Sequence, residues 1–430
     1  MCRPFAEAGL QERRECPSFN GKYGGRCGQI RLVPLYTAPQ ISFCKPMGKY
    51  FDSLTNANNL YQAYLLSKRG CSWKESVQKY GMYALQNIRH AQQELRSATY
   101  VQKPFFEFTL NERGKTRHVR SMHIFDRVIQ RSLCDNVLSP ALEPHLIYDN
   151  GASIKGKGID FTRKRLHAHL EKYIRRHGSK GYILTLDFSK FFDNIQHEPL
   201  LTRVRPILND DEAYELVELL VDTFKVDISY LPEAERERAI HAVFDTVKYE
   251  AVPQESKTGD AFMAKSLGIG SQISQISGVY YPTVLDTWCK VVRRLRYYGR
   301  YMDDLYVIHQ SKEYLKKLKD ELFHIIENTL GMHVNKKKTQ IVPLSRGFTF
   351  MQVKYRVEPS GHITKLIKHD RFTRERRRLK KYRHLLSAGR MDRFNICTAY
   401  QSWRGNMRKF LCRRSLHNMD RLYENLFVYR

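Results

Sequence analysis

Hydrophobic residues recur every three to four positions over several stretches of the chain, and this spacing predicts amphipathic helices. Helices are expected at residues 60–95, 123–143, 160–177 and 312–330. In the last of these, Leu315, Leu318 and Leu322 fall on one face. The same spacing returns in the C-terminal part of the chain, at Phe372 and Leu379.

Other stretches have the patterns of strands. Phe106 and Phe108 alternate with polar residues and lead into a predicted hairpin turn at residues 111–114. Residues 182–186 form a short apolar run that predicts a buried strand, and a second pair of strands is expected around residues 301–308. Strands and helices therefore alternate in the middle of the chain, which predicts a central α/β domain.

The chain has 430 residues, which is enough for about two or three compact units. Its composition and periodicity change from one part to the next. The first residues are rich in Gly, Pro and Cys and show little periodicity. Four segments are expected: a loosely structured leader at 1–46, a helical N-terminal extension at 47–100, the central part at 101–355, and a basic helical unit at 356–430.

The composition excludes some classes of protein and favours others. A hydrophobic fraction of 42% is too high for a disordered chain, and no run of about 18 apolar residues suggests a membrane span. The formal net charge is +29, of which residues 365–414 supply +14, from 17 Lys and Arg against 3 Asp and Glu. Such an excess favours a nucleic-acid partner, although ribosome-like and membrane-surface proteins can be equally basic.

The nine cysteines contain no CxxC pair and are odd in number, so neither a cysteine zinc site nor a disulfide framework is expected. The first 28 residues carry Arg and Glu where a secretory signal needs an apolar core. A cytoplasmic location is therefore expected.

The strongest chemical signal is the pair Asp303 and Asp304, in a tight turn between apolar strands. Alone, this pair is equally compatible with a polar hairpin turn. Asp187 changes the balance, because it stands at the end of the predicted 182–186 strand. Three carboxylates on neighbouring strands can hold two Mg²⁺ ions roughly 3.5–4 Å apart, one at an attacking 3′-hydroxyl and one at a triphosphate. This chemistry is nucleotidyl transfer.

These residues carry a resemblance to a known family. Tyr301-Met302-Asp303-Asp304 resembles the YxDD box of reverse transcriptases, and Asp187 resembles the aspartate of their first palm motif. The resemblance extends over roughly residues 50–430. It implies an α/β (α+β) right-hand polymerase with fingers, an antiparallel palm sheet, a helical basic thumb and a helical N-terminal extension. It also implies an RNA template, a DNA or RNA primer, dNTPs and two Mg²⁺ ions, with Mn²⁺ as a substitute.

The resemblance also assigns residues around the nucleotide. Arg117 resembles the fingers arginine that grips the incoming triphosphate, a task that suits the guanidinium fork, although an ordinary exposed arginine would look the same. Many bacterial relatives carry a further lysine upstream, and Lys115 is the candidate to replace it here. Phe192 occupies the position of the aromatic that excludes a 2′-hydroxyl. In the alternative, Phe191 and Phe192 both belong to the core.

Two further motifs follow in family order. The segment from Gly270 to Gln275 resembles the second palm motif, with Ser274 also expected to cap a helix. Its form is closest to reverse transcriptases of diversity-generating retroelements and of prophage or defence systems in bacteria. Lys338 resembles the lysine that protonates the departing pyrophosphate. Because it ends a run of three lysines, a solvated turn is equally compatible.

The hairpin expected at residues 347–351 resembles the primer grip, and the basic C-terminal unit takes the position of the thumb. Its cluster of basic residues is expected to contact backbone phosphates without reading sequence. These residues are Arg376, Arg377, Arg378, Lys380 and Lys381.

Two other functions remain open at this point. An RNA-dependent RNA polymerase shares the palm and its metal chemistry, but Phe192 disfavours it, because ribonucleotide selection needs a polar partner for the 2′-hydroxyl. A catalytically silent nucleic-acid-binding scaffold is the alternative of another class, and the complete set of carboxylates argues against it. A bacterial retroelement or an anti-phage defence system is the expected setting, and the pattern does not indicate an oligomeric state.

Overall fold

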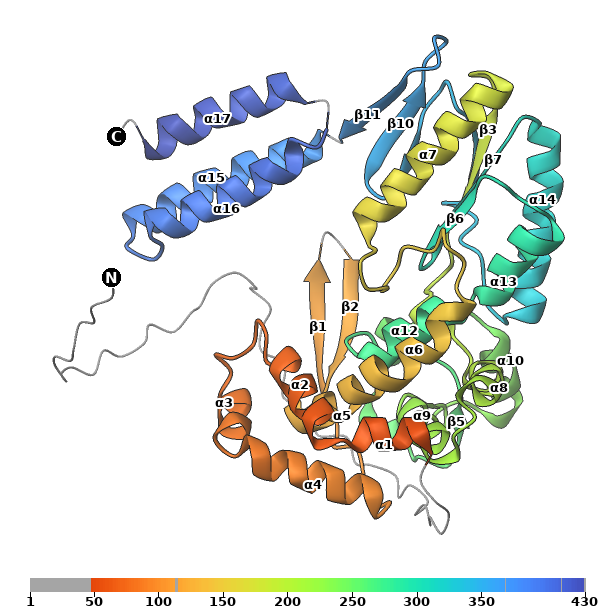
Figure 1. Ribbon diagram of the computed structural model, residues 1–430, viewed down its shortest axis with the longest axis vertical. Coiled ribbons are helices and arrows are strands. Elements are labelled where there is room, and N and C mark those ends of the chain that lie inside the picture. The colour runs from red at the N-terminus through yellow and green to blue at the C-terminus, as the bar shows by residue number, and fades with distance from the viewer. Residues whose placement is uncertain (1–47, 113–114, 368, 411, 429–430) are drawn as a thin grey trace, which may run out of the picture.

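The structure is a computed structural model that describes residues 48–112, 115–367, 369–410 and 412–428. The predicted leader at residues 1–46 and the turn residues Arg113 and Gly114 lie outside these ranges. Figure 1 shows the arrangement of the elements. Within the described ranges, none of the helices combines the length and the apolar character that crossing a membrane requires.

The N-terminal part is helical, as the spacing predicts. Breaks at Asn56, at residues 68–74 and at Tyr83 divide it into four helices. Its elements are α1 (Lys49–Thr55), α2 (Ala57–Ser67), α3 (Glu75–Met82) and α4 (Ala84–Arg96). Their buried faces join the largest core of the molecule, and α1, α2, α3 and α4 all pack against α5 (Ile124–Leu133).

The predicted hairpin is present as β1 (Phe106–Glu112) and β2 (Lys115–Ser121), which pair antiparallel. The helical stretch after it consists of α5, a π-helical turn (Cys134–Leu138) and α6 (Ser139–Leu142). The long helix α7 (Ile159–His177) matches the predicted 160–177 helix.

The centre of the molecule is a four-stranded antiparallel sheet of order β6-β7-β3-β8. Its strands are β3 (Tyr182–Leu186), β6 (Tyr298–Tyr301), β7 (Asp304–His309) and β8 (Gln340–Pro343). Residues alternate between two faces. Ile183 and Tyr306 join a core with α7, whereas Leu184 and Val307 join the core that contains α14 (Lys312–His324). The two helices therefore cover opposite faces of the sheet.

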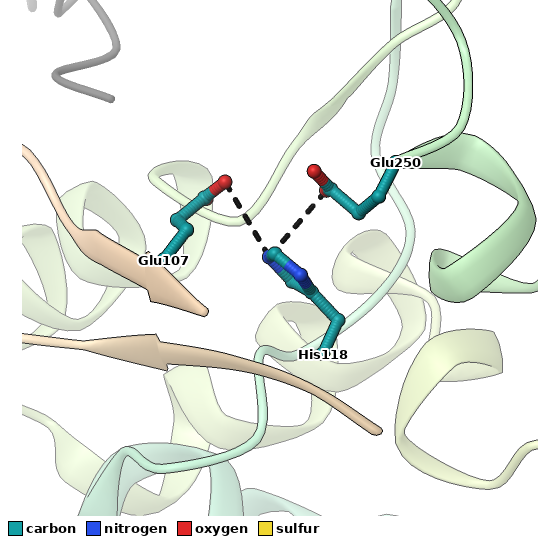
Figure 2. A group of neighbouring side chains, drawn as sticks. All are labelled: Glu107, His118 and Glu250. Carbon is teal, nitrogen blue, oxygen red and sulfur yellow. Dashed lines mark ion pairs between the residues drawn. The ribbon is translucent and has the colours of Figure 1, made fainter. Parts of the chain in front are cut away.

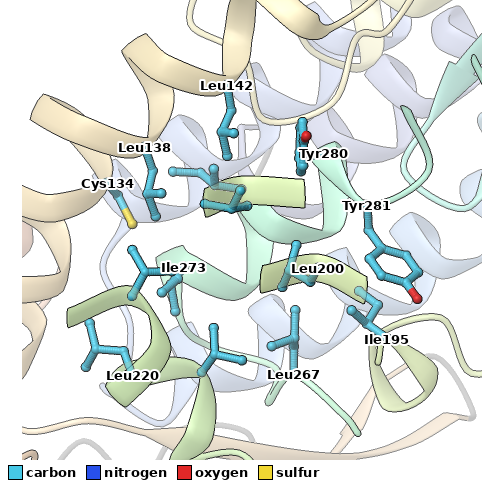
Figure 3. Packing of buried hydrophobic residues seen from close by; sticks show 14 of the residues in the cluster. Cys134, Leu138, Leu142, Ile195, Leu200, Leu220, Leu267, Ile273, Tyr280 and Tyr281 are labelled. Atoms are coloured by element: carbon cyan, nitrogen blue, oxygen red, sulfur yellow. The ribbon is translucent and has the colours of Figure 1, made fainter. Parts of the chain in front are cut away.

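A long connection between β3 and β6 carries most of the remaining helices. Its elements are α8 (His197–Leu208), α9 (Asp211–Asp222), β4 (Val226–Asp227), α10 (Glu233–His241), α11 (Thr246–Tyr249), β5 (Phe262–Met263), α12 (Gln272–Tyr280) and α13 (Thr283–Thr287). The segment from β4 to β5 has a small core of its own. By contrast, α12 lies inside the largest core, where Figure 3 shows Ile273 and Tyr280 among residues of several helices.

The C-terminal part begins with a three-stranded sheet and ends in helices. The strands β9 (Phe348–Phe350), β10 (Val353–Val357) and β11 (Ile363–Ile367) form a sheet of order β11-β10-β9. The helices α15 (Asp370–Ser387), α16 (Arg393–Met407) and α17 (Arg413–Phe427) enclose a separate core around Leu379, Tyr400 and Met419. Residues 363–367, which were expected in the helical unit, instead form β11, because they pair with β10.

Candidate active site

Three carboxylates meet at one end of the central sheet. Asp187 directly follows β3, and Asp304 begins β7, the strand that pairs with β3. Leu186 lies opposite Leu305 in this antiparallel register. One step further along, Asp187 therefore faces Asp304. Asp303 lies in the two-residue turn between β6 and β7, so the register brings all three predicted carboxylates to adjacent strand ends.

A buried arginine supports the turn that carries Asp303. Met302 has a φ of 54°, in the left-handed region that residues other than glycine adopt uncommonly. Arg300 on β6 is fully buried, and its Nη1 donates to the carbonyl oxygen of Met302 at 3.0 Å. Its Nη2 donates to the carbonyl oxygen of Val279 on α12 at 2.9 Å. The guanidinium therefore fixes the turn relative to α12.

The charge of Arg300 is neutralised by Asp286 on α13. Nε donates to Oδ1 of Asp286 at 2.9 Å and Nη2 donates to Oδ2 at 2.6 Å, and both side chains are buried. Burial lowers the pKa of Arg300, but the charge and hydrogen bonds of Asp286 outweigh it and raise the pKa above its usual value. The sequence prediction missed this pair. The available signal was a charged residue inside the otherwise uncharged β6 sequence.

Lys338 contacts Asp187, although its side chain remains 52% exposed, and its role in catalysis stays a prediction. Its Nζ forms an ion pair and a hydrogen bond with Oδ2 of Asp187. Burial lowers the pKa of Lys338, but the hydrogen bond with Asp187 and the charges of Asp187, Asp303 and Asp304 raise it overall. The negative charges of all three carboxylates thus stabilise the same ammonium group.

Backbone hydrogen bonds bring Lys338 to this position. The amide of Ser189 donates to the carbonyl oxygen of His333 at 2.8 Å, and the amide of Asn335 donates to that of Asp187 at 2.8 Å. Residues 333–335 therefore run beside the residues that follow β3. The side-chain amide of Asn335 also donates to Oδ2 of Asp187 at 3.2 Å, a contact that the sequence prediction missed.

The donor set fits Mg²⁺ or Mn²⁺. Asp187, Asp303 and Asp304 offer oxygen atoms only, which are the ligands that hard divalent cations prefer. The ammonium of Lys338 shows that a positive charge is stabilised beside Asp187. These three aspartates would hold the ions, and the ions would supply nucleophile activation and stabilisation of the leaving group.

The β1–β2 hairpin reaches the second predicted motif through its backbone. The amide of Arg120 donates to the carbonyl oxygen of Ile269 at 3.2 Å. Gly270 has a φ of 119°, and a Cβ at this position would lie 3.0 Å from the carbonyl oxygen of Arg120, so that only glycine fits. Arg117 is exposed on β2, on the strand face that it shares with Val119, whose Cγ1 would lie 3.3 Å from a Cβ at Gly270. The side chain of Lys115 lies outside the described part of the structure.

The helix after Gly270 begins differently from the prediction. Ser271, not Ser274, is the N-cap of α12, and its Oγ accepts a hydrogen bond from the amide of Ser274 at 3.5 Å. Ser274 lies inside the first turn because the helix begins at Gln272, and its buried Oγ has no hydrogen-bond partner among the described residues. Gln275 is exposed, although its helix neighbours are buried.

Phe191 and Phe192 point to different environments. Phe191 is buried, whereas Phe192 is half-buried, and their ring centroids are 5.3 Å apart. The ring of Phe192 lies against Gly278 of α12, where a Cβ would come within 2.8 Å of it. Phe191 belongs to the largest core, and Phe192 packs against the same core while staying partly exposed, so the role of Phe192 at the nucleotide stays a prediction.

Of the five predicted phosphate-binding residues, Arg377, Lys380 and Lys381 are exposed on α15, whereas Arg376 and Arg378 are half-buried. Arg378 donates to the buried carboxylate of Glu375 at 2.6 Å, which ties it to the helix. A basic cavity of about 810 Å³ lies between α7, β11 and the C-terminal helices. It includes residues that the prediction did not single out, namely Lys365, Arg404, Arg408, Lys409 and Arg413.

Comparison with known protein families identifies one type of domain. A family model described as "Reverse transcriptase (RNA-dependent DNA polymerase)" matches residues 102–355. No curated protein sequence matches the chain.

Among solved structures, apo telomerase from Candida tropicalis matches 60% of this chain and 48% of its own chain, with 15% identity and a TM-score of 0.38. A form of that telomerase truncated from its C-terminal domain matches 66% of this chain and 60% of its own, with 14% identity and a TM-score of 0.39. This chain thus spans about half of the first telomerase chain and three fifths of the second.

Proposed function

This chain belongs to the reverse transcriptase (RNA-dependent DNA polymerase) family, and from that membership we propose that it copies an RNA template into DNA by adding deoxynucleotides to a primer. One observation carries the proposal. Asp187, Asp303 and Asp304 lie at adjacent strand ends, and all three act on the ammonium of Lys338. A polar turn without a function would not require a second strand end to contribute a carboxylate.

In this proposal the central sheet is the palm, and the β1–β2 hairpin with the helices around it forms the fingers. The C-terminal helices α15–α17 are the thumb, and the β9–β10 hairpin is the primer grip. Template and primer would lie along the basic surface of the thumb, where Arg404, Arg408 and Lys409 line the cavity beside the palm helix α7. Contacts of this kind bind phosphates and carry no sequence information.

The proposed reaction joins the primer 3′-oxygen to the α-phosphorus of a dNTP. The new P–O bond forms as the bond to pyrophosphate breaks, and the hydroxyl proton leaves the primer. Two Mg²⁺ ions held by the three aspartates would supply nucleophile activation and charge stabilisation at the leaving group. Lys338 would donate a proton to pyrophosphate, since a lysine side chain is in its ammonium form at neutral pH.

Residues of the fingers and of α12 would bind the nucleotide. Arg117 would hold the triphosphate through its guanidinium fork, with Lys115 as a second positive charge. Gly270, Ser274 and Gln275 would lie beneath the nascent base pair. The hydrogen bond from the amide of Arg120 to the carbonyl oxygen of Ile269 supports this assignment, because it joins the strand of Arg117 to the residues before α12.

Phe192 would exclude ribonucleotides and so separates this function from RNA synthesis. Its half-buried ring lies against α12 at Gly278, where a Cβ would come within 2.8 Å of the ring. A wall of this kind leaves no polar partner for a 2′-hydroxyl. We place the enzyme in a bacterial retroelement or an anti-phage defence system, with a dedicated non-coding RNA as template, on the form of the segment from Gly270 to Gln275.

Primer extension by the full chain tests the proposal. An RNA template with an annealed DNA primer is incubated with Mg²⁺ and dNTPs, then with rNTPs in place of dNTPs. Asp303→Asn should reduce DNA synthesis by at least about a hundredfold, because metal stabilisation of the transition state is worth several kcal/mol. Asp320→Asn is the matched control, since Asp320 is an exposed aspartate on α14.

Melting temperature and RNA binding are measured for both variants, and both should remain near wild type. Failure of the wild-type chain to extend any primer with Mg²⁺ or Mn²⁺ would support the silent scaffold. Extension with rNTPs in preference to dNTPs would support an RNA polymerase. Equal activity of Asp303→Asn and Asp320→Asn would contradict the assignment of the metal ligands.

A further inference from the structure

A second cluster of metal-ligating side chains lies on the β1–β2 hairpin, on the strand face opposite Arg117. Glu107 on β1 and His118 on β2 belong to this face. Glu250 joins them from the C-terminal end of α11, in the segment between β4 and β5. Figure 2 shows the two carboxylates approaching the imidazole of His118 from different elements. One donor atom of each residue lies within 4.8 Å of the other two.

The imidazole of His118 is buried and aims its Nε2 between the two carboxylates. Nε2 lies 3.4 Å from Oε2 of Glu107 and 3.5 Å from Oε1 of Glu250. Hydrogen bonds between nitrogen and oxygen are shorter, at about 2.7–3.2 Å. Nε2 accordingly has no hydrogen-bond partner among the described residues, although His118 is only 8% exposed. A buried nitrogen without a hydrogen-bond partner is suited to bind a ligand that fits between the three side chains.

Two of the three spacings match the edges of a zinc tetrahedron, and the third, between the oxygens of Glu107 and Glu250, is within 4.8 Å. Zn²⁺ binds imidazole nitrogen and carboxylate oxygen at about 2.0–2.2 Å, which places neighbouring ligand atoms about 3.3–3.6 Å apart. Both distances from Nε2 of His118 fall in this range. We propose that Glu107, His118 and Glu250 bind Zn²⁺ and that the ion fixes the β1–β2 hairpin to the segment at residues 244–250.

The charges around the cluster leave one oxygen of each carboxylate for the ion. Arg120 pairs with Oε1 of Glu107 at 3.0 Å, so Oε2 is the oxygen that faces His118. Burial raises the pKa of Glu107, but His118, Arg120 and Lys257 lower it overall. Burial and the charge of Glu107 raise the pKa of Glu250. A divalent cation would relieve this repulsion, in competition with the ammonium of Lys257.

The segment that carries Glu250 is itself tied to the turn after Asp187. The side chain of Asn194 donates to the carbonyl oxygen of Phe244 at 3.1 Å and accepts from its amide at 2.9 Å. Oδ2 of Asp193 accepts from the amide of Thr246 at 3.3 Å. An ion on Glu250 would therefore connect β2, which carries Arg117, to the turn that carries Phe192.

Metal content of the full chain tests the site. The Asp187→Asn/Asp303→Asn/Asp304→Asn variant serves as background, because it removes the carboxylates of the other cluster. After chelation, addition of Zn²⁺ and gel filtration, this protein should retain about one Zn²⁺ per chain. Adding Glu250→Gln or His118→Ala should weaken Zn²⁺ binding by at least about tenfold. Glu255→Gln, an exposed glutamate of the same segment, is the matched control and should bind as the background does.

Replacement of Zn²⁺ by Co²⁺ identifies the ligands without relying on activity. The expected spectrum has the visible d–d bands of tetrahedral Co²⁺ and lacks thiolate charge-transfer absorption. Lys257→Met should bind Zn²⁺ more tightly, because a competing cation is removed. Zn²⁺ content that is unchanged by Glu250→Gln, or a Co²⁺ spectrum with thiolate bands, would overturn the proposal. If His118→Ala fails to fold, Glu250→Gln and Lys257→Met still decide it, since they must change affinity in opposite directions.

Discussion

Removal of the negative charge of Asp286 should destabilise the protein strongly. Asp286→Asn keeps the shape of the side chain but leaves the fully buried guanidinium of Arg300 without a counter-charge. Breaking a buried ion pair in this way costs about 3–5 kcal/mol. Each kcal/mol lowers the melting temperature of a domain of about 150–250 residues by roughly 2–4 °C. The melting temperature should therefore fall by roughly 6–20 °C.

A double variant separates stability from the position of the active-site turn. In Asp286→Asn/Arg300→Met no charge remains buried, so most of the lost stability should return. The hydrogen bond from Arg300 to the carbonyl oxygen of Met302 is still absent, and the turn that carries Asp303 loses its support. Since small displacements of reacting groups are costly, primer extension should remain roughly tenfold to a hundredfold below wild type.

The two measurements are thermal unfolding followed by circular dichroism and primer extension at a temperature where all variants are folded. Arg293→Met is the matched control, because Arg293 pairs with Glu321 at the surface, where such a pair contributes at most about 1 kcal/mol. An Asp286→Asn variant that melts within about 2 °C of wild type would refute the energetic reasoning. A double variant with wild-type activity would refute the positioning role of Arg300.

Other consequences of the structure can be measured in the same way. Phe192→Val should allow incorporation of rNTPs, and an unchanged dNTP preference in competition assays would return Phe192 to a packing role. Glutamine in place of three exposed cations of α15 should reduce the slope of log affinity against log salt by roughly 0.7–0.9 for each phosphate that the helix no longer binds, whereas Arg378→Gln should not change it. These three are Arg377, Lys380 and Lys381. Burial raises the pKa of Asp126 to about 6, above the unfolded value of about 3.9. The stability that the protonated carboxyl contributes is therefore fully present below about pH 3.9 and is lost as the pH rises through about 6. Asp126→Asn should therefore gain up to roughly 3 kcal/mol relative to wild type between pH 4 and pH 8, and a denaturant-unfolding difference that does not vary with pH would contradict this.

The elements that position the carboxylates could be predicted from the sequence because their patterns are local. The apolar run before Asp187 matches β3, the helical spacing at residues 312–330 matches α14 with its π-helical turn, and β6 and β7 enclose the Asp303 turn. In each of these elements, the hydrophobic residues recur at the spacing that places them on its buried face. The pairing of Asp187 with Asp304 then follows from the antiparallel sheet.

The supporting contacts could not be predicted, because they join residues far apart in the chain. Asp286 and Arg300 are separated by a helix and a turn, and neither belongs to a recognisable motif. The helix cap is Ser271 and not the predicted Ser274. The backbone before the cap is bonded to β2, since the carbonyl oxygen of Ile269 accepts from the amide of Arg120, and this contact is not visible in the sequence. The cluster around His118 depends on Glu250, which the segment between β4 and β5 brings to the hairpin.

Lys338 has features of both interpretations of the three-lysine run. Lys336, Lys337 and Lys338 are all exposed, as is typical of a solvated turn. The turn closed by the hydrogen bond from the amide of Lys338 to the carbonyl oxygen of Asn335 directs only the third lysine toward Asp187.

The position of Lys338 also has a consequence for metal binding. An ammonium beside Asp187 offsets part of the repulsion among the three carboxylates, which are held together by the strand register whether or not an ion is bound. A metal ion that uses Oδ2 of Asp187 must displace this ammonium. In the proposed function, the ammonium that stabilises the three carboxylates without an ion would become the proton donor to pyrophosphate once an ion is bound.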